Sequence, residues 1–368
     1  MLLSKQKHLN AHAIVDYING WQKSKDKLPS WHSNEKVVFP PKLNMEQCSS
    51  ETTALYKSLL TNGKKMIDIT GGMGVDTYYF SNRFEKCIYI EQNESLFEIA
   101  KHNFEIFGKK NIECHSGNGI DFLQNTNSED FDLIYIDPAR RDGAGKKVFI
   151  LTDCEPDVVH FQDLLLSKSK SILIKTSPLL DIDKTISELK HIKEVHVVAV
   201  ENECKELLFL LEKGFDGVPS IVAINYSKNE WKKFTYRKFE EEKTEIEYSN
   251  PLKYLYEPNT AILKSGAFKS VSKHFNVYKL SSNSHLYTSD TENNNFQGRI
   301  FKILTWGSEK EMKSHLIGLK CNVISRNHPL TPEEIKKKYK LKDGGNTFLI
   351  ASLTNDRQYI LLVCERLA

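Results

Sequence analysis

The sequence predicts an α/β protein whose main part is a doubly wound, largely parallel sheet, followed by a smaller α+β module. Two observations predict the sheet: a glycine-rich turn between a strand-like and a helix-like segment, and a regular alternation of apolar runs with helical stretches after it. Shorter strand-like and helical stretches in the lysine-rich last part of the chain predict the module. At 368 residues, the chain is long enough for two or three domains with cores of their own.

The glycine-rich turn occupies residues 68–76 and reads Asp-Ile-Thr-Gly-Gly-Met-Gly-Val-Asp. An apolar run precedes it and a helix-like segment follows it. Gly71, Gly72 and Gly74 lack a Cβ, so the backbone can turn tightly and a ligand can lie against it. Strand, glycine-rich turn and helix in this order are typical of the first unit of a nucleotide-binding sheet.

The alternation that follows predicts the rest of the sheet. Strand-like runs lie at 66–70, 87–90, 112–115, 133–136, 171–175 and 195–200, and helical stretches at 95–107, 120–123, 158–166 and 182–189. Alternation at this spacing predicts a parallel sheet with helices on both faces. Two more apolar runs, 207–211 and 221–224, have no helix between them, which predicts an antiparallel hairpin at one edge of the sheet.

A helical segment precedes the sheet. Apolar residues at helical spacing predict a helix over 10–21, and two prolines require an extended chain within 37–44. A second helix is predicted over 45–57, where hydroxyl groups cluster at the start. These hydroxyls, Ser50 among them, either cap the helix or face a ligand beside the glycine-rich turn.

Residues 228–247 are highly charged and show no apolar periodicity, which predicts a boundary or an exposed linker. A helical unit that Asn259 would cap follows, then two short strand-like runs, then a last α+β stretch with a capping box at 331–334. The predicted domains are an N-terminal helical segment (1–62), the sheet domain (63–228), a small ferredoxin-like α+β linker domain (229–296) and a final α+β domain (297–368).

The net charge of +3 is unevenly distributed. Residues 229–368 carry 23 Lys and Arg against 16 Asp and Glu, whereas residues 1–228 carry 28 against 32. A basic appendage suits a polyanion-binding module, although a solvated lysine-rich surface would have the same composition. No apolar run approaches a membrane span, the 7 cysteines form no CxxC pair and the 12 histidines show no metal-ligand spacing. We therefore expect a cytoplasmic protein without disulfides, a metal or a membrane partner.

Polar residues follow the ends of the first three predicted strands. Asp68 could meet a cationic ligand group in the crevice at the strand end. Glu91 follows the turn by about 20 residues, the spacing at which an acid accepts hydrogen bonds from ribose hydroxyls; otherwise it is a solvated acid. Asn118 could read an adenine ring or merely form a turn, and Asp121 is a second candidate for the adenine.

Charged residues also follow the fourth and fifth predicted strands. Asp137 and Pro138 end the fourth strand. Arg140 and Arg141 come directly after them, beside a glycine-containing loop, and could clamp phosphates or form salt bridges within the loop. Lys175 ends the fifth strand, where it could orient a substrate, deprotonate a hydroxyl or simply be a surface lysine.

Residues 66–211 resemble class I S-adenosylmethionine-dependent methyltransferases, whose fourth strand ends in an acidic residue followed by proline. The resemblance implies a Rossmann-like, seven-stranded sheet and S-adenosylmethionine as the cofactor. It makes residues 68–74 the first motif, Glu91 the ribose-binding acid and Asn118 the adenine-contacting residue. Thr70 stands where many members of the family have a glycine.

Together, segment 46–51, the glycine-rich turn, segment 137–141 and the C-terminal module resemble a family of bacterial proteins classed as methyltransferases with a THUMP-like C-terminal domain. This resemblance implies that residues 297–368 are THUMP-like, and THUMP-type modules grip structured RNA. The predicted cofactor-binding residues are Ser50, Asp68, Thr70, Gly71, Gly72, Gly74, Glu91 and Asn118.

The resemblance also implies a catalytic part for Asp137 and Pro138. An aromatic amine is a poor nucleophile because its lone pair is delocalised into the ring. A carboxylate and the Pro138 carbonyl, both accepting from the amine, would localise that pair and aim it at the methyl group. The alternative is that Asp137 touches only the edge of the cofactor. In related RNA methylases an aromatic residue of this motif stacks the target base, and here Ala139 and Arg140 replace it.

The predicted function is therefore S-adenosylmethionine-dependent methylation of a base of structured ribosomal or transfer RNA. Arg140, Arg141 and Lys175 are the predicted substrate-binding residues. Two alternatives stay open: a methyltransferase for a protein or a small molecule, and a non-catalytic RNA-binding protein that keeps the fold as a scaffold. The sequence predicts no oligomeric state.

Overall fold

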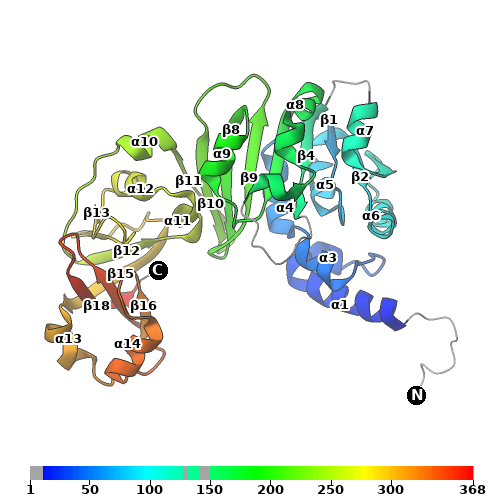
Figure 1. The fold of residues 1–368 in the computed structure, drawn as a ribbon. Helices are drawn as coiled ribbons and strands as arrows, with labels where there is room; N and C mark the ends of the chain where they lie inside the picture. The colour runs from blue at the N-terminus through cyan, green and yellow to red at the C-terminus, as the bar shows by residue number, and fades with distance from the viewer. Residues whose placement is uncertain (1–10, 127–130, 141–149, 368) are drawn as a thin grey trace, which may run out of the picture. The chain divides into compact units, whose positions relative to one another are not determined.

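The structure is a computed structural model that describes residues 11–126, 131–140 and 150–367, without the side chains of 11–14, 16 and 140. The chain forms two compact units. The first comprises Met1–Val200 and Lys205–Pro219, and the second comprises Glu201–Cys204 and Ser220–Ala368. Figure 1 shows their helices and strands along the chain.

Seven strands of a nine-stranded sheet belong to the first unit, in the order β8-β9-β7-β4-β1-β2-β3. Strands β1, β2, β3, β4 and β7 run parallel, and β9 is antiparallel to β7. The bounds of the seven strands are β1 (Gly63–Asp68), β2 (Phe84–Glu91), β3 (Ile112–Ser116), β4 (Phe131–Ile136), β7 (Ser169–Thr176), β8 (Ile192–Val200) and β9 (Glu203–Glu212). This is the doubly wound sheet that the alternation predicts, and the fold class is confirmed.

Helices cover the strands of this unit: α5 and α6 pack on β2, α8 on β7 and α4 on β8. The central strands are therefore apolar on both faces, as the buried run 133–136 of β4 shows. The helices of the unit are α1 (Ala11–Lys27), α2 (Pro29–His32), α3 (Lys42–Gln47), α4 (Glu51–Leu59), α5 (Val75–Phe80), α6 (Glu94–Ile106), α7 (Gly119–Asn125), α8 (Val158–Lys168) and α9 (Ile182–Glu188), with a 3₁₀ turn at Leu151–Asp153. Two short strands, β5 (Ala139–Arg140) and β6 (Cys154–Glu155), pair with each other.

Two predictions about the end of this unit and the stretch after it are wrong. The runs 207–211 and 221–224 do not form a hairpin, because β9 lies between β8 and β7 while β10 (Ser220–Ser227) pairs with β11 (Glu230–Arg237). The stretch 228–247, predicted to be a boundary or an exposed linker, holds β11 and α10 (Lys238–Lys243), so it is not an unstructured linker. Only Phe234 and Tyr236 of β11 are buried, which leaves too little apolar periodicity to predict a strand.

The helix predicted over 45–57 is in fact two helices, α3 and α4, separated at Cys48–Ser50. Ser50 has an extended backbone, with φ −78° and ψ 161°, and its Oγ accepts a hydrogen bond from the Thr53 amide at 3.2 Å. Ser50 therefore starts α4 as its N-cap instead of continuing α3. Helix α3 also begins at Lys42, inside the stretch that was predicted to be extended.

The second unit contains a seven-stranded sheet in the order β13-β14-β12-β15-β18-β17-β16. Its elements are β12 (Tyr254–Pro258), α11 (Thr260–Ser265), α12 (Phe268–Phe275), β13 (Tyr278–Lys279), β14 (Tyr287–Ser289), β15 (Gly298–Gly307), α13 (Glu309–Leu316), β16 (Asn322–Ser325), α14 (Pro332–Tyr339), β17 (Thr347–Leu353) and β18 (Tyr359–Arg366). Sequence reasoning missed β12 and merged α11 with α12. Gly266, with φ 84°, ends α11 after Asn259 has capped its start.

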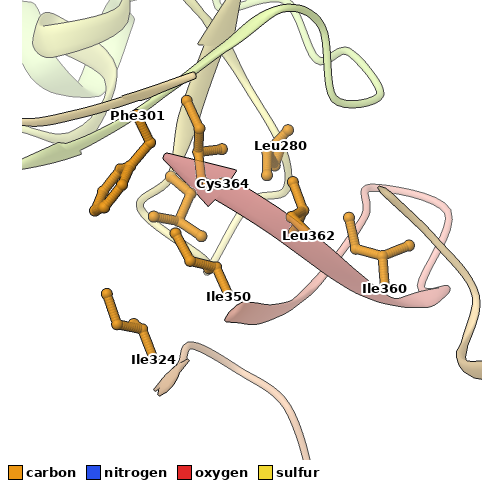
Figure 2. Close-up of a cluster of buried hydrophobic side chains, with 9 residues drawn as sticks. Leu280, Phe301, Ile324, Ile350, Ile360, Leu362 and Cys364 are labelled. Carbon is orange, nitrogen blue, oxygen red and sulfur yellow. The ribbon is translucent and has the colours of Figure 1, made fainter. Parts of the chain in front are cut away.

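This second sheet buries both of its faces, because alternate residues along a strand point to opposite sides. Ile360, Leu362 and Cys364 of β18 belong to one buried cluster, which Figure 2 shows together with Ile350 of β17. Leu361 of the same strand belongs to a second cluster with side chains of α13 and α14. Within the described ranges, every helix of the protein is too short or too polar to cross a lipid bilayer.

Candidate functional site

A cavity of about 880 Å³ opens at the carboxyl ends of the parallel strands in the first unit. Residues that follow β1, β2, β3, β4 and β7 line it, and part of α3 forms another wall. Ligands of doubly wound sheets bind at this edge, because the loops after the strands leave a crevice there. Lys27 supports the α3 wall, since its Nζ donates to the Met45 and Glu46 carbonyl oxygens at 2.8 Å each.

The glycine-rich turn meets the cavity at Gly72, which has φ 55°. A Cβ there would have only the Thr70 carbonyl oxygen nearby, at 3.9 Å, so the open side of this residue is available to a ligand. Gly71 has a different task, because a Cβ on it would lie 2.2 Å from the Tyr89 ring. Gly71 and Gly74 line only a second, small cavity of about 50 Å³. The predicted close approach of a ligand is therefore supported at Gly72 alone.

Glu91, the predicted ribose-binding acid, is buried and lines the main cavity at the end of β2. One carboxylate oxygen accepts from the Gly72 amide at 2.7 Å, and the other accepts from the Asn93 amide at 2.7 Å. These bonds fix the carboxylate against the turn. A carboxylate has about four acceptor sites, so Glu91 keeps capacity for a pair of ligand hydroxyls.

Asn118 also lines the cavity, but its Oδ1 caps α7 by accepting from the Ile120 and Asp121 amides at 2.8 and 3.2 Å. Both roles that the sequence left open are thus compatible with its position, with the side-chain amide nitrogen left for a ligand. Asp121 is exposed and is not among the lining residues. Neither cavity is lined by Ser50, whose hydroxyl is occupied by the cap of α4.

Asp68 is buried beneath the turn and lines only the small cavity. Its carboxylate accepts from the Thr77 hydroxyl at 2.6 Å and from the Thr70 amide at 3.0 Å. Burial raises the pKa of Asp68 to about 7, although these two hydrogen bonds act to lower it. Asp68 therefore holds the turn in place. It is not among the residues that line the main cavity, where a cationic ligand group was expected to meet it.

Asp137 and Pro138 line the main cavity directly after β4. The Asp137 amide donates to the Thr70 hydroxyl at 2.7 Å, which ties the end of β4 to the glycine-rich turn. Thr70 thus has a structural reason to stand where related sequences carry a glycine: only a side chain can supply that oxygen. The Asp137 side chain is 35% exposed, so it is open to a ligand in the cavity.

Lys175 is buried, and the interpretation of this residue as a surface lysine is wrong. Its Nζ forms an ion pair with the Asp137 carboxylate, and both residues line the cavity. Burial alone would lower the pKa of Lys175, but Asp137, Asp76 and Glu206 together raise it above its usual value. The cavity therefore contains a lysine side chain held against a carboxyl group.

A buried ionic cluster that sequence reasoning missed lies in the same unit, made by Ser49, Lys57, Asp76, Tyr135 and Glu206. Lys57 Nζ contacts both Glu206 carboxylate oxygens at 2.8 and 2.9 Å and one Asp76 oxygen at 3.2 Å. The other Asp76 oxygen accepts from the hydroxyls of Ser49 and Tyr135 at 2.8 and 2.7 Å. Burial alone would raise the pKa of Asp76, but Lys57 and Lys175 hold it below its usual value. The only signals in the sequence were isolated charges within apolar segments.

Two predicted substrate-binding residues cannot be placed. Arg141 and the side chain of Arg140 lie outside the described residues, although the Arg140 backbone belongs to β5. Thr176 is a further cavity residue that sequence reasoning missed. It is 7% exposed, and its hydroxyl has no hydrogen-bond partner among the described residues. Across the described part of the chain, no group of three or more His, Cys, Asp or Glu could hold a metal ion.

The residues present fit the nucleoside part of the predicted cofactor. Gly72 offers an uncovered backbone, Glu91 offers acceptor sites for hydroxyls, and Asn118 offers an amide, all on one cavity. Asp137 and Lys175 add a charged pair that could act on a second molecule. The arrangement can therefore bind a nucleoside-containing donor beside a group that transfers or accepts a proton.

Comparisons with known proteins agree with this geometry. One family model, described as RNA cap guanine-N2 methyltransferase, matches residues 63–145. A ferredoxin-like domain model matches residues 254–296, and a THUMP domain-like model matches residues 298–366. The crystal structure of a presumed methyltransferase from Porphyromonas gingivalis W83 is 33% identical, with a TM-score of 0.88, over 97% of this chain and 90% of that chain.

Two curated proteins match part of the chain. One, from Methanobrevibacter smithii, is described as a probable cobalt-precorrin-6B C(15)-methyltransferase and is 26% identical over 138 residues, 37% of this chain and 66% of that protein. Protein L320 of Acanthamoeba polyphaga mimivirus is 25% identical over 150 residues, 39% of this chain and 58% of that protein. The chain thus spans less than two thirds of the length of either one.

Proposed function

Because the chain belongs to the family of class I S-adenosylmethionine-dependent methyltransferases with a THUMP-like C-terminal domain, we propose that it methylates structured RNA. The observation that carries the proposal is the composition of one cavity. Glu91 and Gly72, the residues expected to hold the methyl donor, line the same cavity as the Asp137–Lys175 pair. A methyl donor and a methyl acceptor could therefore meet in it.

S-adenosylmethionine, when bound, supplies an electrophilic methyl group on a sulfonium. Glu91 would accept hydrogen bonds from the two ribose hydroxyls, since its carboxylate is already held in place by backbone amides. Gly72 would let the donor lie against the turn, and Asn118 would contact the adenine. Asp137 would act on the acceptor, because its carboxylate is the half-exposed acidic group held next to a buried ammonium.

The proposal of RNA as the acceptor rests on the second unit. Residues 298–366 match the THUMP domain-like model, and residues 229–368 carry 23 Lys and Arg against 16 Asp and Glu. Exposed lysines gather on α14 and just after it, at Lys337, Lys338, Lys340 and Lys342. Surfaces of this kind bind phosphate backbones, and their affinity falls steeply with salt.

The test uses the full-length protein, S-adenosylmethionine with a labelled methyl group, and total RNA from cells that lack the gene. The proposal expects label in that RNA and much less label in RNA from cells that have the gene, because its sites are already methylated. Label in protein or in small molecules, with none in RNA, would contradict the proposal and support the alternative acceptors. A separate titration with S-adenosylhomocysteine checks the donor site without turnover.

A further inference from the structure

The first observation concerns the side chains that line the described part of the cavity. None of the described lining residues is Phe, Tyr, Trp or His. Enzymes that act on a base take it out of the stack and hold it between aromatic or apolar side chains. The residue next to the Asp137-Pro138 pair is Ala139, whose side chain cannot stack a ring. Among the described lining residues, a base would therefore meet aliphatic side chains but no aromatic ring.

The Asp137–Lys175 pair also suits a different acceptor. An exocyclic amine needs only acceptors for its N–H groups, and the Lys175 ammonium beside Asp137 offers none. An aliphatic hydroxyl has other needs: it becomes a good nucleophile only as it loses its proton, so it requires a base and a nearby positive charge. Asp137 and Lys175 supply both on the cavity wall. The unpartnered Thr176 hydroxyl lines the same cavity and can hydrogen-bond a polar acceptor.

Behind this pair lies the buried ionic cluster. Lys57 is 0% exposed and contacts both Glu206 and Asp76, while Glu206 lies on β9, the strand that pairs with the strand of Lys175. Buried charges need compensation. The cluster and the Asp137–Lys175 pair together contain two lysines and three carboxylates, so each charge has a neighbour of opposite sign. The cluster therefore sets the electrostatic field in which Asp137 and Lys175 act.

We propose that the group methylated is a ribose 2′-hydroxyl of structured RNA, with Asp137 and Lys175 as catalytic residues and Lys57 and Glu206 as positioning residues. The hydroxyl oxygen attacks the methyl carbon, the carbon–sulfur bond breaks with its electron pair left on sulfur, and the hydroxyl proton passes to the Asp137 carboxylate. The Lys175 ammonium stabilises the charge that develops on the oxygen. The choice of RNA rests on the proposed function; the choice of a hydroxyl rests on the cavity.

The first experiment asks which atom carries the methyl group. RNA from cells lacking the gene is labelled in vitro with the full-length protein, digested to nucleosides, and the label is assigned to base or ribose by mass spectrometry. The proposal expects label on ribose and expects the same 2′-O-methyl nucleoside to be missing from RNA of the cells without the gene. Label on a base would overturn the inference while leaving RNA methylation intact. Unlabelled RNA would refute the proposed function and, with it, this inference.

The second experiment asks whether the cluster acts through charge, using the pH dependence of kcat. The other titratable groups around the Asp137–Lys175 pair come from β1, β4, α5, β9 and α4. Asp68 and Tyr135 face Asp137, Asp76 and Glu206 face Lys175, and Lys57 pairs with Asp76 and Glu206. Lys27 and Cys48 face Lys175 from the N-terminal wall, and Lys205 lines the cavity. Each variant replaces one of these titratable groups and leaves all the others as they are in the wild type.

Lys57→Met removes a positive charge and should move the acidic limb of the kcat profile to higher pH, because Asp137 then binds its proton more tightly. Glu206→Gln removes a negative charge and should move the same limb to lower pH. Both variants should keep the wild-type affinity for S-adenosylhomocysteine, and exposed Lys190→Met is the matched control. If the acidic limb moves in the same direction in both variants, or if kcat falls while the limb stays in place, the cluster has only a structural role. Either result would overturn this part of the inference. Should Lys57→Met fail to fold, Lys57→Arg is the alternative, expected to restore the wild-type profile.

Discussion

The two sides of the cavity are built in different ways. On the donor side, Glu91 is held by the Gly72 amide, 19 residues away in the sequence, and by the Asn93 amide beside it. On the acceptor side, Asp137 pairs with Lys175, and the cluster behind them joins Lys57 to Glu206, 149 residues away. The donor side uses one carboxylate and neighbouring backbone, whereas the acceptor side uses side-chain charges from five segments of the chain.

This difference predicts how strongly substitutions on each side of the cavity affect the protein. Backbone amides cannot be substituted away, so the donor side has few side chains whose loss would destroy it. The acceptor side depends on mutual compensation of buried charges, and removal of one partner leaves another buried and unpaired. We therefore expect substitutions on the acceptor side to have larger effects, on turnover and on stability, than substitutions on the donor side.

The largest effect should follow from Asp137→Asn. The amide keeps the size of the side chain but cannot accept a proton, so kcat should fall by about 10²- to 10⁴-fold, the usual contribution of a positioned base. The affinity for S-adenosylhomocysteine should stay near the wild-type value, since the bond between Asp137 and Thr70 uses the Asp137 backbone amide, which the substitution keeps. Single-turnover kinetics and calorimetry measure the two quantities, and an unchanged kcat would exclude Asp137 from the chemistry.

A large effect on stability should follow from Lys57→Met. Glu206 and Asp76 would remain buried without their shared cation, so the free energy of unfolding should fall by about 3 kcal/mol or more. Urea unfolding of the full-length protein measures the change. Lys190→Met, which breaks an exposed pair with Asp163, should alter stability by less than about 0.5 kcal/mol. An equal loss of unfolding free energy in Lys57→Met and Lys190→Met would show that Lys57 does not compensate the charges of Glu206 and Asp76.

Much of the fold could be predicted from the sequence, because its signals are local. Every strand-like run between 66 and 200 is a strand, and the capping box at 331–334 and the glycine-rich turn lie where their residue types require. The errors occur where a local signal is weak or misleading. Edge strand β11 buries only alternate aromatic residues, and the short apolar run of β12 is followed at once by Glu257 and Pro258, so it is too short to predict a strand.

The site also contains some residues that the sequence could predict and others that it could not. Glu91, Gly72 and Asp137 could be predicted, since each lies at a fixed distance from a strand end that periodicity locates. Lys57 and Glu206 could not be predicted, because a lysine in a helix and a glutamate at the start of a strand are ordinarily solvated. Only the folded chain brings them to 2.8 Å and excludes water from both. A buried ion pair between distant segments leaves no pattern in the sequence.

On the donor side, Glu91→Ala should weaken the binding of S-adenosylhomocysteine by about 1–3 kcal/mol, through loss of charge-assisted hydrogen bonds. The turn should keep its shape, since the Gly71 amide still donates to the Ile90 carbonyl oxygen at 2.8 Å. Calorimetric titration measures the affinity, and Glu113→Ala on the neighbouring strand is a matched exposed control. Unchanged affinity would mean that the ribose lies elsewhere and that Glu91 does not belong to the donor side.

The smallest effect concerns Asp68, which lies between the two sides and supports the turn. Its pKa is raised from 3.8 to about 7 by burial, so the folded protein keeps a proton that the unfolded chain has released at intermediate pH. A group of this kind makes the folded state less stable as pH rises from about 4 to about 7, and adds no further change above that. Asp68→Asn removes the titrating carboxyl group while keeping a side-chain oxygen for the Thr70 amide.

The free energy of unfolding of the wild type, relative to that of Asp68→Asn, should therefore fall by about 1 kcal/mol between about pH 6 and about pH 7.5. Urea unfolding at both pH values tests this, and an unchanged relative stability would show that Asp68 is already ionised in the folded state at pH 6.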